Sequence, residues 1–346
     1  MDARGTEEHQ ENYGGEMRLS INSLREQVTK ILEKNLSHEQ AEIVAKYFVW
    51  AEMSGNKTQG IVKLMGASSI QNIRPQGEIE IVKDTKLSRI IDAKDNPAPL
   101  NAQIATDVAI QKANEHGFAI VGVKNTFSSN GAQAYYVEQI ARHDLIGIMC
   151  SRSPASQAAF GGIDPVFGTD PIGFGFPSLG EPLVFDAATS AMTYYGLVLA
   201  KSRGETIPEN MAIDKDGRPT TDPSAAMDGA LLSFDRSYKG SGFAMVVEAL
   251  AGPLLGGAWV DNMTFKEEWG TIVMAIDPDL MVGREQFKEN TSDMIAKIKS
   301  SRTIGDSSIR LPGESAQQQY EAAKNSGEVE IDDAVANEIG IFGDKS

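Results

Sequence analysis

Strand-like and helix-like segments alternate between residues 89 and 150, and this alternation limits the possible fold more than any other feature of the sequence. Asn101 is expected to cap a helix that Gly117 closes, and residues 130–143 repeat apolar side chains at helical spacing. The strand signals around these helices are Arg89–Asp92, Phe118–Val123 and Leu145–Cys150. Such alternation predicts an α/β fold in which helices cover a mixed sheet.

Helical patterns also flank this region. A first helix is expected near Asn22, and a second to begin with a capping box of Ser37 and Gln40 and to stop at Gly55. Residues 285–299 have a helical pattern as well.

The chain is acidic, with 48 acidic and 32 basic residues and a formal charge of −16. Residues 1–16 contribute −4 and residues 314–346 contribute −6, so most of the charge lies at the two ends. A chain with this balance is not expected to bind nucleic acid or an anionic membrane surface, because both need clustered Lys and Arg. We interpret residues 1–16 as a disordered acidic extension.

The number and spacing of the cysteines and histidines bear on disulfides, metal sites and the cellular compartment. The single cysteine, Cys150, excludes an intramolecular disulfide and favours a cytoplasmic protein. The four histidines lack the spacing of a zinc site, so no metal is expected. The N-terminus carries no apolar signal region.

Two segments have the chemistry of an anion site. Lys239-Gly-Ser-Gly242 precedes an apolar helix expected at 243–251, so glycines, free helix amides and a lysine come together. Asp186-Ala-Ala-Thr-Ser190 lies at a strand-to-helix junction, with a helix expected over 191–203. An ordinary loop and a simple helix cap remain the alternatives. The sequence contains neither a Rossmann fingerprint nor a Walker A motif.

Taken together, these segments resemble the malate/L-lactate dehydrogenase family, the group of sulfolactate, ureidoglycolate, diketogulonate and cyclic ketimine oxidoreductases. The ordered matches are Gly168-Thr-Asp-Pro-Ile172, Asp186-Ala-Ala-Thr-Ser-Ala191, the segment 212–223, Gly229-Ala-Leu-Leu232, Tyr238-Lys-Gly240, Ala275-Ile-Asp-Pro278 and Leu311-Pro-Gly-Glu314. The resemblance spans roughly residues 17–342.

The resemblance implies a homodimer that binds NAD or NADP on an α/β fold of its own, not on a Rossmann domain, with a helical domain formed from the N- and C-terminal segments. It implies cofactor contacts at Asp170, Thr189, Ser190, Lys239, Gly240, Gly313 and Glu314. The expected regions are 17–85 (N-terminal helical and substrate region), 86–130 (first part of the α/β core), 131–280 (NAD(P)-binding region) and 281–346 (C-terminal helical segment packing on the N-terminal region).

The chain departs from the family at the catalytic positions. Gln59 stands where the family has its acid/base histidine, and Ser128 or Ser129 stands where a second histidine is usual. Glutamine cannot titrate, so reduction of a ketone needs another proton donor. Either Lys57 or Lys63 could donate if burial lowers its pKa. Alternatively, the substrate is an iminium that already carries the proton, or this chemistry has been lost.

Two further residues are candidates for the site, and Lys63 has a second possible role. Asp186 could orient groups or relay protons, or simply cap the helix that follows. Lys63 and Arg152 could hold a substrate carboxylate, and Arg152 could equally be a surface arginine.

The resulting prediction is an oxidoreductase that moves hydride between nicotinamide and C2 of a small anionic 2-hydroxy or 2-oxo acid. The alternatives are a cyclic ketimine reductase that uses NADPH and a cofactor-binding protein without dehydrogenase activity. The expected site is locally basic through Lys57, Lys63, Arg152, Arg236 and Lys239. Deleting residues 1–16 is therefore expected to leave cofactor affinity nearly unchanged.

Overall fold

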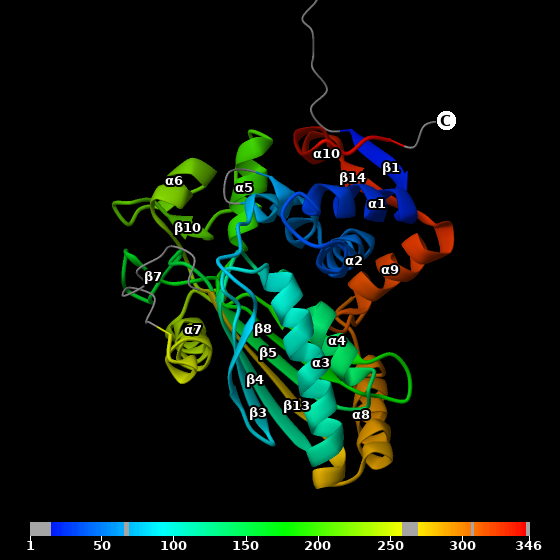
Figure 1. Ribbon diagram of the computed structural model, residues 1–346. Helices are drawn as coiled ribbons and strands as arrows, with labels where there is room; N and C mark the ends of the chain where they lie inside the picture. Colours follow the sequence, from blue (N-terminus) through cyan, green and yellow to red (C-terminus); the bar gives the residue numbers. More distant parts are fainter. Residues whose placement is uncertain (1–14, 66–68, 258–268, 306–307, 344–346) are drawn as a thin grey trace, which may run out of the picture.

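A seven-stranded mixed sheet lies at the centre of the computed structural model, which describes residues 15–65, 69–257, 269–305 and 308–343 (Figure 1). Strands β3 and β4 run parallel, and the other neighbouring pairs run antiparallel. In spatial order the strands are β2 (Glu80–Asp84), β3 (Ser88–Asp92), β4 (Phe118–Thr126), β13 (Trp269–Ile276), β5 (Ile146–Arg152), β8 (Ile172–Phe176) and β9 (Leu183–Ala187). The predicted mixed α/β architecture is confirmed.

Helices cover the two faces of this sheet (Figure 1). On one face lie α3 (Ala98–His116) and α4 (Ala134–Ala141), and on the other α7 (Tyr238–Ala251) packs against β5 and β13. Because side chains alternate along a strand, Met149 joins the core under α3 and α4 whereas Cys150 joins the core under α7. After β13 come η6 (Pro278–Leu280) and α8 (Arg284–Lys299), and η4 (Pro253–Leu255) follows α7.

The N- and C-terminal segments meet in a two-stranded antiparallel sheet, β1 (Glu16–Ser20) with β14 (Glu328–Asp332). In Figure 1 this sheet lies at the top of the molecule beside the terminal helices. These are α1 (Ile21–Leu32), α2 (His38–Met53), α9 (Glu314–Ser326) and α10 (Asp333–Ile339). Three 3₁₀ helices follow α2, namely η1 (Lys57–Gln59), η2 (Ile61–Leu64) and η3 (Ile70–Asn72).

A smaller five-stranded sheet and two helices form the remaining layer. Its strand order is β11 (Pro219–Thr220), β10 (Ala212–Ile213), β12 (Ala230–Leu231), β6 (Gln157–Ala158) and β7 (Pro165–Phe167), and its helices are α5 (Tyr194–Ser202) and α6 (Pro223–Asp228).

The predicted capping box of α2 is present: Ser37 Oγ accepts from the Gln40 amide, and the Gln40 side chain accepts from the Ser37 amide. Gly117 closes α3 in the left-handed conformation, as predicted. Asn101 was expected to cap this helix and does not, because α3 begins three residues earlier and Pro97 is its N-cap.

Three other helix starts differ from the prediction. Helix α5 begins at Tyr194 with Thr193 as its cap, so Thr189 and Ser190 precede it as a loop. Helix α7 begins at Tyr238, which places the predicted glycine-rich loop inside its first turn. Helix α4 begins at Ala134, so residues 130–133 form a loop.

The predicted extension of residues 1–16 overlaps the described part of the chain at its end. Residues 1–14 lie outside the described part of the chain, and Glu16 belongs to β1, where it is paired with Asp332. None of the helices in the described residues is long and apolar enough to cross a membrane.

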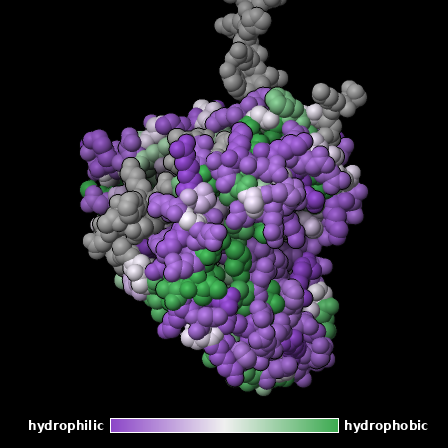
Figure 2. Space-filling model, in the orientation of Figure 1, coloured by the Kyte–Doolittle hydropathy of each residue, from purple (hydrophilic) through white to green (hydrophobic). Residues whose placement is uncertain are grey.

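Apolar side chains are exposed at the sheet edge, where Ile81 and Val82 of β2 and the nearby Leu87 lie open to solvent. Figure 2 shows hydrophobic residues gathered on the same side of the molecule, over β3 and the adjoining part of α3. Oligomers often bury surface of this kind, and the homodimer implied by the resemblance stays a prediction.

Candidate active site

Lys63 lies at the centre of the candidate site, where three segments converge. It is carried by η2, its Nζ donates to Ser129 Oγ at 3.0 Å, and it lies 3.9 Å from the ring centroid of Tyr195 on α5. The side chain is only 1% exposed and forms no ion pair with a carboxylate of the described residues. Burial lowers the pKa of Lys63 to about 7, because the interior disfavours the charged form.

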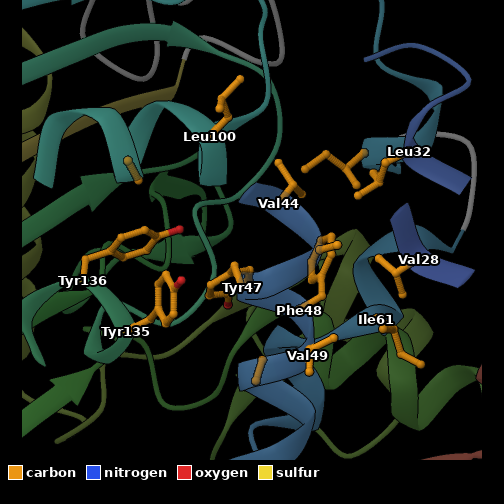
Figure 3. Close-up of a cluster of buried hydrophobic side chains, with 14 of the residues drawn as sticks. Val28, Leu32, Val44, Tyr47, Phe48, Val49, Ile61, Leu100, Tyr135 and Tyr136 are labelled. Carbon is orange, nitrogen blue, oxygen red and sulfur yellow. The ribbon is translucent and has the colours of Figure 1, made fainter. Parts of the chain in front are cut away.

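Tyr47 joins the Gln59 segment (residues 57–64) to the serine loop (residues 127–133, between β4 and α4). Its hydroxyl donates to the Gln59 carbonyl at 2.9 Å and accepts from the Ala132 amide at 2.6 Å. Figure 3 shows its ring among the buried side chains of α2, next to Tyr135 and Tyr136. Gly131 has φ +86°, and a Cβ there would lie 1.7 Å from the Tyr47 hydroxyl, so only glycine fits.

The serine loop is fixed to the sheet by buried hydrogen bonds. Asn130 Nδ2 donates to Ser151 Oγ at 2.5 Å and to Thr271 Oγ1 at 2.6 Å, which links the loop to β5 and β13. Ser128 is buried in the left-handed region with φ 67°, and its hydroxyl lies beside Tyr195. A non-glycine residue in this conformation is uncommon and is stabilised here by its surroundings.

Asp186 lies at the end of β9 and caps α4 from across the loop. Its Oδ2 accepts from the Ala134 amide at 3.0 Å, and the Gln133 amide also faces it. Burial raises the pKa of Asp186 to about 6, and the two amides oppose part of this rise. The carboxylate therefore caps a different helix from the following one that the sequence suggested.

Glu52 and Lys57 lie behind the Gln59 segment. Glu52 Oε1 accepts from the Ile61 amide at 2.8 Å, and burial raises the pKa of Glu52 to about 7. The Lys57 Nζ donates to Glu16 Oε1 at 2.5 Å, so this lysine extends toward β1 and not toward Lys63.

Arg152 lies on the opposite face of the sheet from Lys63. Ser151 points under α4, so the next side chain, Arg152, points under α7, where it is 2% exposed. Its guanidinium lies close to Gly252 and Gly257, and the buried carboxyls of Asp170 and Glu248 share this region. The structure thus separates the two cations predicted to hold one substrate carboxylate.

Asp170 occupies this buried region in a left-handed conformation, with φ 39°. Its Oδ1 accepts from the Ser153 amide at 3.3 Å. Burial and the neighbouring Glu248 hold the pKa of Asp170 well above its usual range.

The start of α7 is occupied by a carboxylate of the protein itself. Asp235 Oδ1 accepts from the amides of Ser237 and Gly240 at 3.0 and 3.1 Å, and Oδ2 accepts from the Ser237 hydroxyl. Lys239 is exposed and forms no ion pair with the described residues. The anion position predicted at this helix start is therefore already filled.

The remaining predicted cofactor residues fall into two groups. The Thr189 hydroxyl donates to the Thr169 carbonyl at 3.2 Å and the Ser190 hydroxyl to the Met192 carbonyl at 2.7 Å, and both side chains are buried. Gly313, with φ +81°, precedes α9, which has no side-chain cap, whereas Glu314 pairs with Lys299.

Sequence reasoning missed Tyr47, Tyr195 and Asp235 as parts of these sites. The pattern of α2 predicts that Tyr47 is buried, but it cannot show which loops its hydroxyl meets. Asp235, two residues before Ser237, is a recognisable local capping signal that could have been used.

Comparison with known proteins shows the family to which this chain belongs. The malate/L-lactate dehydrogenase family model matches residues 19–340. The L-sulfolactate dehydrogenase of Methanothermobacter thermautotrophicus is 32% identical over 314 residues, which cover 88% of this chain and 90% of the relative. The Delta(1)-pyrroline-2-carboxylate/Delta(1)-piperideine-2-carboxylate reductase of Pseudomonas syringae pv. tomato is 32% identical over 296 residues, with coverages of 80% and 82%.

A solved structure agrees with the sequence matches. The sulfolactate dehydrogenase from Methanocaldococcus jannaschii superposes with a TM-score of 0.80 at 29% identity, covering 94% of this chain and 98% of the other. The family model spans nearly the whole chain, and the chain therefore belongs to the malate/L-lactate dehydrogenase family.

Proposed function

We propose that the protein is an NAD(P)-dependent oxidoreductase of small 2-hydroxy or 2-oxo acids in which Lys63 carries the proton. The observation that supports this most is the buried Lys63, which bonds Ser129 and has no carboxylate partner among the described residues. An amine with a pKa near 7 can exist in both protonation states at neutral pH, as a general acid or base must.

The residues of this chain fit a nicotinamide dinucleotide, which supplies hydride acceptance or donation when bound. Helix α9 has no side-chain cap, and Arg310 donates to Ser315 in its first turn, so free amides and a cation are available for a phosphate. Gly313 and Glu314 would line this end. Lys239 and Gly240 would contribute at the side of α7, although Asp235 already binds the Gly240 amide.

Thr189, Ser190 and Asp170 would shape the cofactor site without necessarily touching the cofactor. The two hydroxyls are engaged with backbone carbonyls, and Asp170 holds the Ser153 amide. Such contacts fix the loops that enclose a site.

In the reduction direction, protonated Lys63 would deliver a proton to the substrate oxygen as charge develops there. In the oxidation direction, its neutral amine would accept the hydroxyl proton. Ser129 holds the Nζ and Tyr195 covers it, so water is kept from the amine. Gln59 and Ser128 would hydrogen-bond the substrate, Asp186 would orient the start of α4, and Arg152 would support the sheet from the α7 side.

A cyclic imino acid reductase is the second candidate. Gln59 cannot titrate, and a protonated iminium needs no acid in the hydride step. The similarity to the reductase of Pseudomonas syringae pv. tomato supports this alternative.

A substrate panel with Lys63→Met tests the proposal. The panel contains 2-oxo acids, 2-hydroxy acids and cyclic imino acids, each with both nicotinamide cofactors, followed by NAD(P)H absorbance. Lys63→Met should lower kcat for 2-oxo acids by about 10²–10⁴-fold, whereas Lys46→Met, an exposed lysine on α2, should not. Turnover of imino acids alone, unaffected by Lys63→Met, would identify the reductase. Tight cofactor binding without turnover would contradict both enzymatic proposals.

A further inference from the structure

A surface pocket of about 460 Å³ lies where the end of α2 faces α9 and β14, behind the Gln59 segment. This volume lies in the range of small-molecule sites. Its wall is apolar in part, through Met53, Ala323 and Val329. Its polar lining consists of Arg18, Glu52, Lys57, Gln319, Ser326, Glu328 and Glu330.

Glu52 is the most deeply buried acid of this pocket. Its side chain is 5% exposed, and Oε1 accepts from the Ile61 amide. That amide is its one hydrogen-bond partner in the described part of the chain, so Oε2 has none there. A buried carboxylate with an unused oxygen at a cavity is a ready acceptor for a donor that enters the cavity.

The basic side chains of the pocket are already neutralised. Arg18 pairs with Glu330 at 2.6 Å, and Lys57 pairs with Glu16 at 2.5 Å. Glu328 forms no ion pair with a described residue. The lining carries three acids, Glu52, Glu328 and Glu330, against the two bases, and one of these bases already pairs with Glu16 from outside the lining, so the pocket favours a cation over an anion.

We propose that this pocket binds a small organic ammonium ion, whose N–H groups donate to Glu52 Oε2 and to Glu328 while its carbon chain lies on the apolar wall. The pocket does not include Lys63, Ser129 or Tyr195, and its ligand binding does not depend on the proposed reaction.

Occupancy of the pocket acts on the active-site segment through Glu52. The Ile61 amide that Glu52 accepts lies two residues before Lys63. A Cβ at Gly60 would lie 1.9 Å from Glu52 Oε1, so the carboxylate packs directly against this segment. A bound ammonium ion keeps Glu52 ionised, and an ionised carboxylate forms the stronger bond to the Ile61 amide. The ligand thus stabilises the turn that carries Lys63.

Titration of the full chain with n-butylammonium chloride tests the site by calorimetry, with n-butanol and sodium butyrate as neutral and anionic comparators. Butylammonium should bind about tenfold tighter than either comparator. Glu52→Gln, which keeps an oxygen for the Ile61 amide, should weaken binding about tenfold, and Glu328→Gln by a smaller factor. Glu321→Gln on α9, outside the pocket lining, should have no effect.

Two readouts separate this proposal from a merely structural role of Glu52. Binding should tighten about tenfold from pH 6 to pH 8, because the ligand requires the ionised carboxylate, and this dependence should vanish in Glu52→Gln. The charged or titratable groups that face Glu52 are Lys57, Asp332, Tyr47, Arg18, Glu328 and Glu330. Amide exchange of residues 57–64 should slow with ligand bound.

The proposal is overturned if butyrate or butanol binds as tightly as butylammonium, if Glu52→Gln or Glu328→Gln binds it as the parent does, or if exchange of residues 57–64 is unchanged at saturation. Neither cofactor nor substrate is present, so these outcomes are independent of the proposed oxidoreductase activity.

Discussion

The Tyr47 hydroxyl donates to the carbonyl oxygen of Gln59 at 2.9 Å, and this bond anchors the Gln59 segment to helix α2. The same hydroxyl accepts from Ala132 in the serine loop, so one atom holds both sides of the candidate site.

Tyr47→Phe should remove both hydrogen bonds while keeping the packed ring. We expect a loss of about 1–3 kcal/mol in the free energy of unfolding and a fall in kcat larger than the change in KM. Denaturant unfolding and steady-state kinetics measure the two effects. Tyr135→Phe is the matched control, since the Tyr135 hydroxyl has no hydrogen bond within the described residues. Equal effects of the two variants would contradict the anchoring role of Tyr47.

Lys63 should make stability depend on pH in a defined direction. Its pKa is about 7 in the folded protein and about 10.5 when unfolded, so between these values the unfolded chain binds more protons. The free energy of unfolding should therefore rise with pH above 7, by up to about 1.4 kcal/mol per pH unit relative to Lys63→Met. Urea unfolding of both proteins at several pH values gives this difference, and parallel curves would show that Lys63 stays charged in the fold.

Asp235 should contribute to stability by accepting from amides at the start of α7, beside the N-cap Ser237. Asp235→Ala leaves the Gly240 and Ser237 amides without their acceptor, which should cost about 0.5–2 kcal/mol. Thermal unfolding measures the loss, and Asp293→Ala on the exposed side of α8 serves as control. Cofactor affinity that rises in Asp235→Ala would show that the start of α7 can bind phosphate once its own carboxylate is removed.

The Arg152→Ala variant distinguishes two roles of Arg152, support of the sheet and binding of the substrate. Removing one member of a buried charged cluster typically costs about 3–5 kcal/mol, so Arg152→Ala should unfold far more easily than the parent. Arg302→Ala, at an exposed position after α8, should not. If Arg152→Ala keeps its stability and raises only the KM for the acid substrate, then Arg152 contacts the substrate after all.

The acidic extension can be tested at a boundary that the structure defines. Deleting residues 1–14 should leave cofactor affinity nearly unchanged, because all the candidate cofactor residues lie outside this segment. Extending the deletion through Glu16 should also remove the ion pair with Lys57 and part of β1. Fluorescence titration with NADH and NADPH compares the two truncations, and a marked change in the shorter one would place the extension at the site.

Local signals in the sequence predicted local structure well. The capping box at Ser37 and the left-handed Gly117 depend on neighbouring residues, and both are present. The prediction of a helix start was wrong where three capping groups compete: Thr189, Ser190 and Thr193 all precede α5, and only Thr193 caps it. Which one wins depends on tertiary contacts, since Thr189 is engaged with Thr169 across the chain.

The sequence predicts only part of the candidate site. Alternation along β5 could not tell which face of the sheet would meet α4, so Lys63 and Arg152 were assigned to one substrate although they lie on opposite faces. The desolvation of Lys63 likewise requires knowing that Tyr195 and the serine loop cover it.

The pairing of β1 with β14 has a consequence for synthesis of the chain. Arg18 and Glu330, which pair across this sheet, are 312 positions apart. The strand that completes the first segment is therefore synthesised about 300 residues after its partner strand. The early helices must wait for it, while the central sheet can form first. Helix α10 contacts η2, which carries Lys63, so this segment can complete its packing only after the chain has been made as far as α10.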